Sequence, residues 1–448
     1  MHDESCGDGL SPNDIRQFLT RIAAVAVSGA ETEGGVDDDG ADGASATLAV
    51  ETITALEELK AAAAGAQAVL TTLVADTIRQ QRREAGRPAA RWNTGIATQI
   101  GLARKDSPHR GTTHLGLARA LTAEMPHTLG QLRRGDLSEW RATILVRETA
   151  CLTAEDRRLV DARLCADPAV LTGKGDSTVA AMAARLAAEL DAAAVARRKA
   201  RAARHRRVTV RPAPDFMGHL GALLPMDRAV CVWATLRRDA DTLIATGDAD
   251  GRTRDQIMAD LLVERTIGLA PALRPPVAVQ VVISDQSLLG GSDIPAEVPG
   301  YGPIPAAAAR EWIHDAVDSD TAVTLRKLYA RPTDGHLTAV ESVARCFPTG
   351  LARLIDLRDR TCRTPWCDAP IRHHDHITPH EDGGPTTADN GLGLCAACNL
   401  AKQGDGWATT RTDDTDSRTG HVVDFRTPTG HTYRSISPPL PTPWKRTG

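Results

Sequence analysis

The chain has 448 residues, of which 42% are apolar but only 3% aromatic, and alanine supplies much of the apolar share. This length argues against a single hydrophobic core, and the abundance of Ala, Leu, Glu and Arg favours a mainly α N-terminal region with a few strands. A formal net charge of −4 excludes a chain that is basic throughout, so nucleic-acid binding would depend on local patches and bound metal cations.

The first 45 residues are acidic and glycine-rich around residues 31–40, and we expect a flexible N-terminal tail there because little of it can be buried. Residues 1–17 show neither a basic start nor an apolar core, so no secretion signal is visible. The longest uncharged, largely apolar stretch, residues 61–75, is shorter than the ~20 residues that a membrane span needs. Together these features predict a cytoplasmic protein with no membrane association.

A helical domain is expected over residues 46–270. Apolar residues recur at helical spacing over residues 47–83, and Gly86-Arg-Pro ends the run. Ser138 and Thr153 are plausible helix caps. Further helices are predicted over residues 113–123, 129–134, 138–149, 153–165, 178–206 and 255–267, with a short strand at 208–212.

Residues 271–345 are expected to form a mixed α/β connecting region. Residues 275–284 are rich in β-branched residues in an alternating pattern, which predicts a strand. The glycines and prolines of residues 290–305 predict an ordered loop or linker, and a helix follows at 306–317. A second short helix at 349–358 lies at the start of a cysteine-rich module, residues 346–410. A small hairpin and a Pro-rich tail are expected over residues 411–448.

Five of the nine cysteines fall in that module, four of them as two close pairs. Cys362 and Cys367 are separated by four residues, and Cys395 and Cys398 by two. In a reducing compartment such pairs are read first as metal ligands, and two pairs of thiolates can form a tetrahedral Zn²⁺ site. Structural Zn²⁺ would contribute folding free energy to a module too small to bury much core. The alternative is four incidental buried cysteines.

Residues around these pairs have the chemistry that cleavage of a phosphodiester bond requires: a base to activate water and a cation to stabilise charge. Histidine suits the base because its pKa is ordinarily near neutrality, and Asp and Asn oxygens suit a hard cation such as Mg²⁺. Asp375, His376 and Asn399 supply one base and two hard ligands. Neighbouring strand residues point to opposite faces, so Asp375 and His376 can share a site only at a strand end, at a bulge, or through a bridging water.

The pattern Asp-His-Ile-x-Pro, Gly-Gly, Asp-Asn and Leu-Cys-x-x-Cys-Asn-x-x-Lys resembles the HNH endonuclease family, a small α+β fold called the ββα-metal finger. The resemblance implies a hairpin carrying Asp375 and His376, a loop carrying Asn390 and a helix over about residues 394–403 carrying Asn399. It implies that His376 is the general base, that Asp375 and Asn399 hold a catalytic Mg²⁺ or Mn²⁺, and that Asn390 fixes the loop. Asn399 stands where the name of the motif has a second His, a variant found within the family.

Other polar residues of the module have several interpretations. Lys402 lies one helical step past Asn399, and we expect it to contact phosphate. His373, His374 and His380 are either additional metal ligands or, as we favour, solvated positions and outer-sphere donors.

The N-terminal part resembles the helical domain of unknown function that precedes HNH modules in a large bacterial family. The resemblance is carried by Met125-Pro-His-Thr-Leu-Gly-Gln-Leu, Leu223-Leu-Pro-Met-Asp, Gly251-Arg-Thr-Arg-Asp-Gln and Gly300-Tyr-Gly-Pro-Ile-Pro. It assigns no chemistry to this domain. The segment Arg252-Thr-Arg-Asp-Gln256 is either a polar site or, as we favour, a capping box made by Thr253 and Gln256.

Basic residues gather at the end of the predicted helix 178–206. Arg197, Arg201 and Arg204 fall on one stripe, where mutual repulsion would be relieved by a phosphate backbone. An equally good interpretation is a solvated helix end favoured by the helix dipole.

These observations predict a metal-dependent endonuclease that cleaves double-stranded DNA, and the resemblance implies that the product carries a 5′-phosphate. The alternative is a catalytically inactive, zinc-stabilised DNA-binding protein derived from a mobile element. A third hypothesis is a zinc-stabilised protein–protein adaptor, which would have no salt-dependent affinity for DNA.

Overall fold

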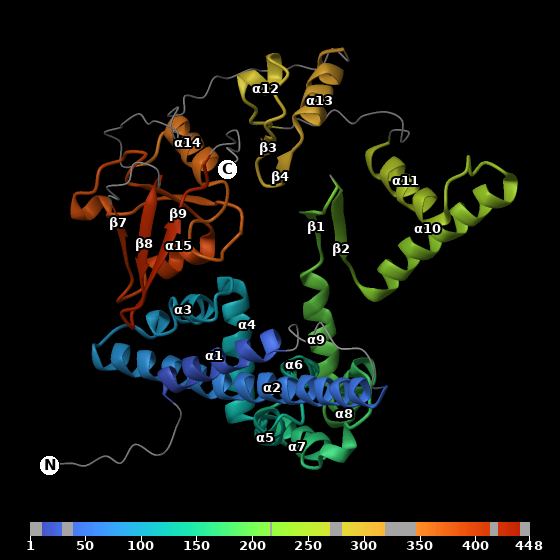
Figure 1. Ribbon diagram of the computed structural model, residues 1–448, viewed down its shortest axis with the longest axis vertical. Helices are drawn as coiled ribbons and strands as arrows, with labels where there is room; N and C mark the ends of the chain where they lie inside the picture. The colour runs from blue at the N-terminus through green and yellow to red at the C-terminus, as the bar shows by residue number, and fades with distance from the viewer. Residues whose placement is uncertain are drawn as a thin grey trace. The chain divides into compact units, whose positions relative to one another are not determined.

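The computed structural model describes residues 11–28, 39–215, 217–268, 280–318, 346–412 and 420–439 (Figure 1). The chain forms two compact units, residues 1–60 and 61–448. The first unit contains helix α1 (Pro12–Ser28), which lies inside the predicted flexible tail and corrects that prediction in part. Ser11 and Asp14 cap this helix reciprocally, since each backbone N–H donates to the other's side chain, and such a pair stabilises a helix start. Most of the acidic segment that motivated the prediction, residues 29–38, lies outside the described residues.

Helix α2 (Asp39–Glu84) confirms the predicted helix at residues 47–83. Within the described residues, its part Ala46–Glu84 is long and apolar enough to cross a membrane, judged by length and composition alone. Core helices of soluble proteins pass the same test, and several of its alanines have such a core role. Ala61, Ala64 and Ala68 are buried in the main core of the helical domain. Ala75 is buried in a second apolar cluster.

The rest of the helical domain consists of helices joined by short turns: α3 (Ile96–Ala103), α4 (Pro108–Ala123), α5 (Pro126–Arg134), α6 (Glu139–Glu148), α7 (Ala154–Cys165), α8 (Asp176–Leu190) and α9 (Ala192–Arg204). Ser138 and Thr153 cap α6 and α7 as predicted, each accepting from the backbone N–H three residues on. The predicted helix 178–206 is divided, because Asp191 leaves helical geometry and its side chain caps α9. Helix α3 was not predicted.

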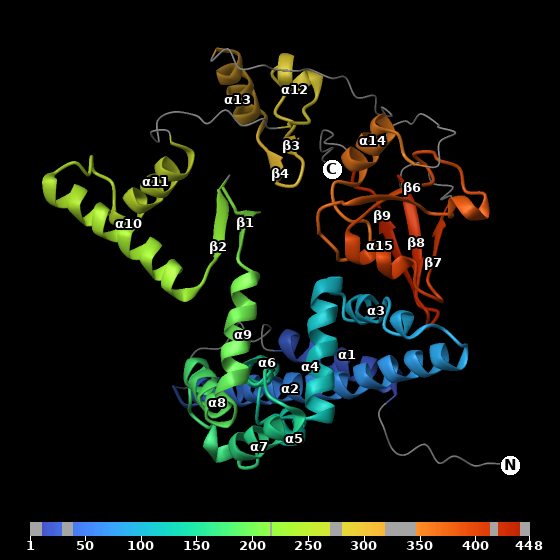
Figure 2. The ribbon, with the colours of Figure 1, turned by 180° about the vertical axis from the view of Figure 1, so that it is seen from behind.

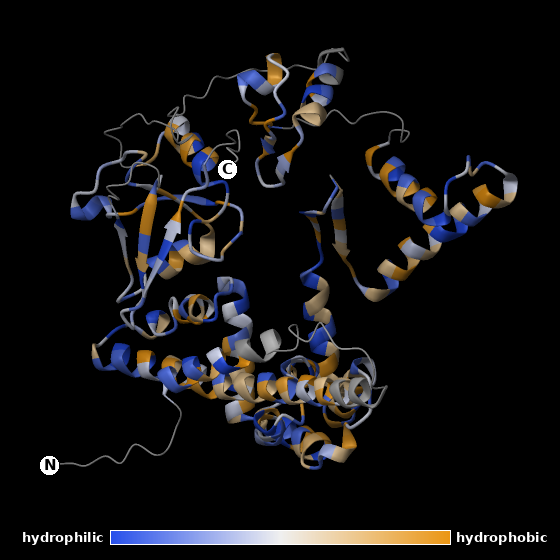
Figure 3. Cartoon of the chain, in the orientation of Figure 1, coloured by the Kyte–Doolittle hydropathy of each residue, from blue (hydrophilic) through white to orange (hydrophobic). Residues whose placement is uncertain are grey.

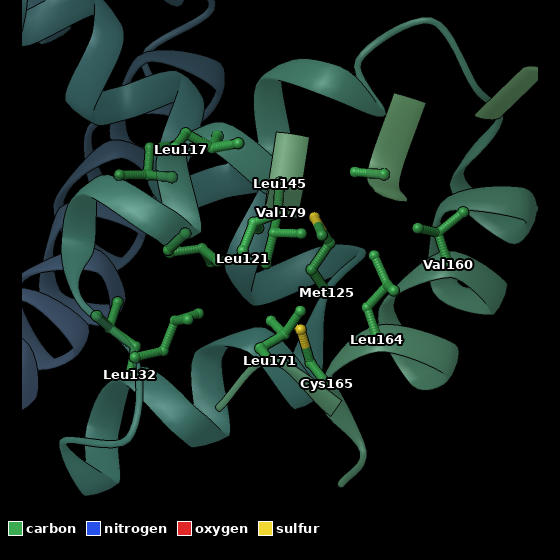
Figure 4. Packing of buried hydrophobic residues seen from close by; sticks show 14 of the residues in the cluster. Leu117, Leu121, Met125, Leu132, Leu145, Val160, Leu164, Cys165, Leu171 and Val179 are labelled. Carbon is green, nitrogen blue, oxygen red and sulfur yellow. The ribbon is translucent and has the colours of Figure 1, made fainter. Parts of the chain in front are cut away.

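The core of this domain is built from apolar side chains of α2, α4, α5, α6, α7 and α8, and Figure 4 shows how some of them pack. Its fully buried members include Leu121, Met125, Leu132, Leu145 and Val179. These residues come from α4, α5, α6, α8 and the turn after α4, so the core depends on the whole helical array.

Strand β1 (Arg207–Pro212) confirms the predicted short strand and pairs antiparallel with β2 (Gly218–Leu223). Helices α10 (Met226–Thr246) and α11 (Arg254–Ile267) follow, and α10 was not predicted. Thr253 and Gln256 form the capping box of α11, as we favoured. The arginines on either side of Thr253 form ion pairs. The guanidinium of Arg252 lies 2.9 Å from the Asp260 carboxylate, and Arg254 pairs with Asp241 of α10. Figure 3 shows apolar residues along α10, where Trp233 and Val230 remain exposed.

The connecting region contains α12 (Asp285–Leu289), β3 (Ala296–Val298), β4 (Gly302–Ile304) and α13 (Ala306–Asp318). Strands β3 and β4 form a hairpin inside residues 290–305, where a loop was predicted. Residues 275–279 of the predicted strand lie outside the described residues. The described half, residues 280–284, does not form the predicted strand and makes only an isolated bridge between Val282 and Glu297. The predicted helix 306–317 is confirmed by α13.

The C-terminal module starts with α14 (Thr349–Asp359), which confirms the predicted short helix. Strands β5 (His373–His376) and β6 (Gly391–Leu394) pair antiparallel, and α15 (Ala396–Lys402) follows them, so the predicted ββα arrangement is present. Strands β7 (Ala408–Arg411), β8 (Val422–Arg426) and β9 (Thr432–Ile436) form a second sheet in the order β7-β8-β9.

The second sheet corrects the predicted module boundary at residue 410. The hairpin expected after it exists as β8 and β9, but β7 adds a third strand. Val423 and Phe425 of β8 are buried against the cysteines, so the hairpin is part of the module's core. The Pro-rich tail from residue 440 onward lies outside the described residues.

Candidate metal centre

The four predicted zinc ligands lie together in the core of the C-terminal module. All four Sγ atoms lie within 4.8 Å of one another. The Sγ of Cys367 is 3.8 Å from that of Cys395 and 3.7 Å from that of Cys398. Tetrahedral Zn²⁺ with Zn–S bonds of about 2.3 Å spaces its sulfurs about 3.8 Å apart, so the four cysteines fit this ion. In the described part of the chain they are the only group of three or more His, Cys, Asp or Glu side chains that could hold a metal.

Local geometry brings each cysteine pair to the centre. Cys395 is the N-cap of α15, and its Sγ accepts from the backbone N–H of Cys398 at 3.4 Å, which sets the second pair one helical turn apart. The first pair closes a turn in which Trp366 adopts a left-handed conformation with φ of 58°. Hydrogen bonds from neighbouring thiols lower the pKa of Cys395, while those around Cys398 raise its pKa. Adjacent thiolates repel one another, so a cation between them is what allows all four to ionise.

Asp375 and Lys402 form an ion pair between β5 and α15. The Lys402 Nζ donates to Asp375 Oδ2 at 2.8 Å and to the backbone oxygen of His376 at 2.5 Å. The Lys402 side chain is only 9% exposed, because α15 packs its last turn against β5. The sequence predicts that Lys402 contacts phosphate. In the structure its ammonium instead binds the carboxylate of Asp375, a predicted metal ligand.

His376 is buried at the last position of β5, opposite Gly391 of β6. Its Nε2 lies 2.9 Å from the hydroxyl of Thr386, and its ring centroid lies 4.6 Å from that of Phe347. Of the three geometries that would let Asp375 and His376 share a site, this position corresponds to the strand end, where strict alternation of side chains stops.

The other histidines of the segment have different surroundings. The Nε2 of His374 lies 2.7 Å from the Asp356 carboxylate of α14, so this side chain links the strand to the helix before it. The ring of His380 lies 5.8 Å from that of His376, and His373 is exposed. None of them belongs to a group of metal-ligating side chains among the described residues.

Asn390 holds the loop between β5 and β6 in a closed form. Its Oδ1 accepts from the backbone N–H of Thr378 at 2.9 Å, and its Nδ2 donates to the backbone oxygens of Thr378 and Pro385 at 3.0 and 2.8 Å. A buried amide that satisfies three backbone groups ties both ends of the loop that follows His376. This contact pattern agrees with the loop-fixing role that the resemblance implies.

Asn399 lies in the middle of α15, one turn before Lys402. Its Oδ1 is buried and has no hydrogen-bond partner within the described residues. An unpaired buried acceptor costs about 1–3 kcal/mol, so such atoms mark places where a donor or a cation belongs. Carboxylate and amide oxygens are ligands for hard cations, and the oxygens of Asp375 and Asn399 therefore fit Mg²⁺ or Mn²⁺.

A buried ionic network at the end of α14, which was not predicted, stabilises the module. The Asp359 side chain is 0% exposed and accepts from Arg358, Arg363 and the backbone N–H of Gly393. Burial opposes its ionisation, but the two guanidinium groups outweigh burial and hold the pKa of Asp359 below its usual range. Arg358 also donates to the backbone oxygen of Gly391, directly opposite His376. The network therefore fixes β6 against α14.

The network continues through Arg363 to the second sheet. Arg363 donates to the backbone oxygen of His421 at 2.9 Å, and the His421 ring donates through Nε2 to the backbone oxygen of Asp389 at 2.8 Å. Burial, with a further contribution from Arg358 and Arg363, lowers the pKa of His421 to about 3. His421 is therefore neutral at physiological pH and serves as a structural link between β8 and the loop before β6.

Two segments of the helical domain contact the C-terminal module. Arg82, near the end of α2, is buried and donates to three backbone oxygens of residues 91–94 and, at 3.1 Å, to the backbone oxygen of Asp405. Gly95 precedes α3 with φ of 75°, and a Cβ on it would lie 2.4 Å from Trp407 Nε1. Figure 2 shows α3 beside the module, and α3 and α15 are in contact. No local sequence pattern predicts the contacts between Arg82 and Asp405 or between Gly95 and Trp407, because each joins residues more than 300 positions apart.

The arginines of α9 are only partly paired. Arg197 lies 3.5 Å from Asp191, the N-cap residue of α9. Arg201 and Arg204 are exposed, and neither has a carboxylate partner in the part of the chain that the structure describes. The predicted stripe therefore offers unpaired cations to solvent, at a place separate from the metal centre in sequence.

Comparison with known families adds two matches. A family model described as a domain of unknown function, DUF222, matches residues 53–359, which is more than half of the chain. A family model described as HNH endonuclease matches residues 362–405, the segment that contains the four cysteines and all four predicted catalytic residues. No curated protein and no solved structure matches the chain.

Proposed function

This chain belongs to the family of the DUF222 domain and carries an HNH endonuclease domain behind it, and we propose that it is a metal-dependent endonuclease that hydrolyses double-stranded DNA. The product would carry a 5′-phosphate. The observation that carries the proposal is the position of His376 at the end of β5, where Thr386 contacts its ring and Asn390 closes the loop that follows. A base needs such fixed geometry to act on a bound water.

His376 is the general base of the proposed reaction. Its contact with the Thr386 hydroxyl fixes the orientation of the ring. A neutral imidazole held in this way can take the proton of the attacking water. The Phe347 ring packs beside the imidazole and limits the access of bulk water to it.

Asp375 and Asn399 hold the catalytic Mg²⁺ or Mn²⁺. The buried, unpartnered Oδ1 of Asn399 and the carboxylate of Asp375 supply the hard oxygen ligands that these ions prefer. A divalent cation there would stabilise negative charge on the scissile phosphate and on the leaving oxygen. Cys395 and Cys398 would hold the structural Zn²⁺ from the first turn of α15, and an ion there would fix the start of the helix that carries Asn399.

DNA binding beyond the metal centre uses the exposed arginines of α9. Arg201 and Arg204 carry charges that no carboxylate among the described residues neutralises, and phosphate groups of a duplex would do so. Such contacts do not depend on sequence, and they would add affinity for any duplex.

The test is incubation of the purified full-length protein with supercoiled plasmid, with and without Mg²⁺ or Mn²⁺. The wild-type protein is expected to relax or linearise the plasmid only with the metal. His376→Ala should lose at least ~100-fold of the rate, the usual contribution of a general base, while keeping most of its DNA affinity. His373→Ala, an exposed histidine on the same strand, is the matched control and should cleave like the wild type.

Three results would contradict the proposal. Cleavage that needs no divalent cation would contradict the proposed metal dependence, and equal rates for His376→Ala and the wild type would remove the assigned base. Salt-dependent DNA binding without any cleavage would favour the inactive DNA-binding alternative.

A further inference from the structure

The ammonium of Lys402 occupies the side of Asp375 that faces α15. It donates to Asp375 Oδ2 at 2.8 Å and to the backbone oxygen of His376 at 2.5 Å. Both acceptors are hard oxygens of the kind that bind Mg²⁺ and Mn²⁺. The other proposed ligand, Asn399, is on the same helix one turn earlier and has its Oδ1 buried without a partner. One protein cation therefore already sits on a carboxylate that the proposed mechanism assigns to a metal ion.

Burial makes this ion pair different from a surface pair. The Lys402 side chain is 9% exposed and that of Asp375 is 24% exposed, so water screens their interaction only in part. A lysine ammonium is a compact point charge that is not delocalised. A dication bound to Asp375 would be repelled by this charge at short range, whether it used the same carboxylate oxygen or the other one.

We propose that Lys402 is a positioning residue that orients Asp375 and lowers the affinity of the nuclease site for divalent cations, so that metal binding requires its ammonium to withdraw from the carboxylate. The inference rests on the proposed function, because it takes Asp375 and Asn399 to be the metal ligands. This role differs from the phosphate contact that the sequence predicts for Lys402. Once the ammonium has withdrawn from Asp375, however, it would be available to contact a phosphate group.

The experiment is a titration of the zinc-loaded full-length protein with Mn²⁺, in which the paramagnetic resonance signal of free Mn²⁺ measures binding without any cleavage. Lys402→Met removes the charge and keeps the length of the side chain. It should bind Mn²⁺ about tenfold more tightly than the wild type, within the usual range of coupling between two sites. Lys402→Arg retains a cation beside Asp375 and should keep the weak affinity of the wild type.

Two controls define the site. Lys60→Met breaks an exposed Lys–Glu pair of 2.6 Å on α2 and should leave Mn²⁺ affinity unchanged. Asp375→Ala should lose the site. Zinc content and thermal unfolding are measured for each variant, and Lys402→Gln replaces Lys402→Met if the latter does not fold.

The outcomes separate the two proposals. If Asp375→Ala loses Mn²⁺ binding but Lys402→Met and Lys402→Gln bind no more tightly than the wild type, the role of Lys402 is overturned and the proposed function stands. If neither the wild type nor the Lys402 variants show Mn²⁺ binding that depends on Asp375, the assigned metal ligands are wrong and both proposals fail. Tighter binding by Lys402→Met, with Lys402→Arg unchanged, supports the inference.

Discussion

Asn390 and Thr378 are joined by two hydrogen bonds, one in each direction: Thr378 N–H donates to Asn390 Oδ1 at 2.9 Å, and Asn390 Nδ2 donates to the Thr378 oxygen at 3.0 Å. Thr378 follows His376 by two residues, so the amide of Asn390 sets the path of the chain as it leaves β5. The side chain of Asn390 thus fixes the backbone two residues after His376, the proposed base.

Asn390→Ala removes three side-chain hydrogen bonds of about 1 kcal/mol each and frees the loop. We expect the single-turnover cleavage rate to fall about 100-fold, because a shift of about 1 Å in a catalytic group has that effect. DNA affinity, measured by fluorescence anisotropy, should stay within a factor of a few. Asp389→Ala, which alters an exposed neighbour paired with Arg411, is the control. A parallel loss of rate and affinity would show that the loop binds DNA instead.

Zinc removal should unfold the C-terminal module. The cysteines form one apolar core with Leu392, Leu394 and Phe425, so loss of the metal exposes this core as well as the thiolates. One Zn²⁺ per chain is expected by elemental analysis, and Cys398→Ser should lose both the metal and the folded module. Cys231→Ser, at an exposed cysteine, should retain full zinc content. A Cys398→Ser protein with unchanged zinc and unfolding would refute the assignment.

His421 makes stability depend on pH in the mildly acidic range. Its pKa is about 3 in the folded protein against 6.5 for an unperturbed histidine, so only the unfolded chain gains this proton between pH 6.5 and 3. The contribution of His421 to stability is therefore complete above pH 6.5 and is lost as the pH falls. The slope approaches about 1.4 kcal/mol per pH unit. Urea unfolding from pH 7 to 5 should show a smaller slope for His421→Gln; equal slopes would contradict the assignment.

Gly95→Ala tests the contact between the helical domain and the C-terminal module. Gly95 and Gly86 both have positive φ, of 75° and 69°, so alanine costs about 1–2 kcal/mol of backbone strain at either position. Only at Gly95 would the added Cβ meet a neighbour, Trp407 Nε1 at 2.4 Å. Gly95→Ala should therefore lower the free energy of unfolding by about 1–3 kcal/mol more than Gly86→Ala. Equal losses for the two variants would mean that the contact does not form in solution.

Arg201→Ala with Arg204→Ala should weaken DNA binding by charge alone. The logarithm of the DNA-binding constant falls linearly with the logarithm of the salt concentration, with a slope of about −0.9 for each phosphate contact. The slope of the double variant should therefore be less steep than that of the wild type by up to about 2. Arg185→Ala is the control, since Arg185 is exposed on α8 and paired with Glu189 at 2.8 Å. If the slope of the double variant equals that of the wild type, α9 is a solvated helix end and makes no DNA contact.

Much of the local structure was predictable because it is encoded by residues that are close in sequence. Ser138, Thr153 and the pair Thr253–Gln256 cap helices through hydrogen bonds that span three residues, and each was predicted from that spacing. Helix α3 was not predicted, and its core-facing residues Ile96 and Ile100 pack on α2. Short helices of this kind depend on a partner surface more than on their own pattern.

The sequence by itself determined the four-cysteine cluster and the ββα frame, because the cysteine pairs and the residues from Asp375 to Asn399 are close enough for spacing to constrain their geometry. Only the tertiary structure decided what these residues contact. Lys402 reaches Asp375 across 27 residues, Arg363 reaches His421 across 58, and Arg82 reaches Asp405 across 323. Such pairs form between segments that the fold brings together, and no local periodicity or spacing records which distant backbone oxygen or carboxylate a buried cation will meet.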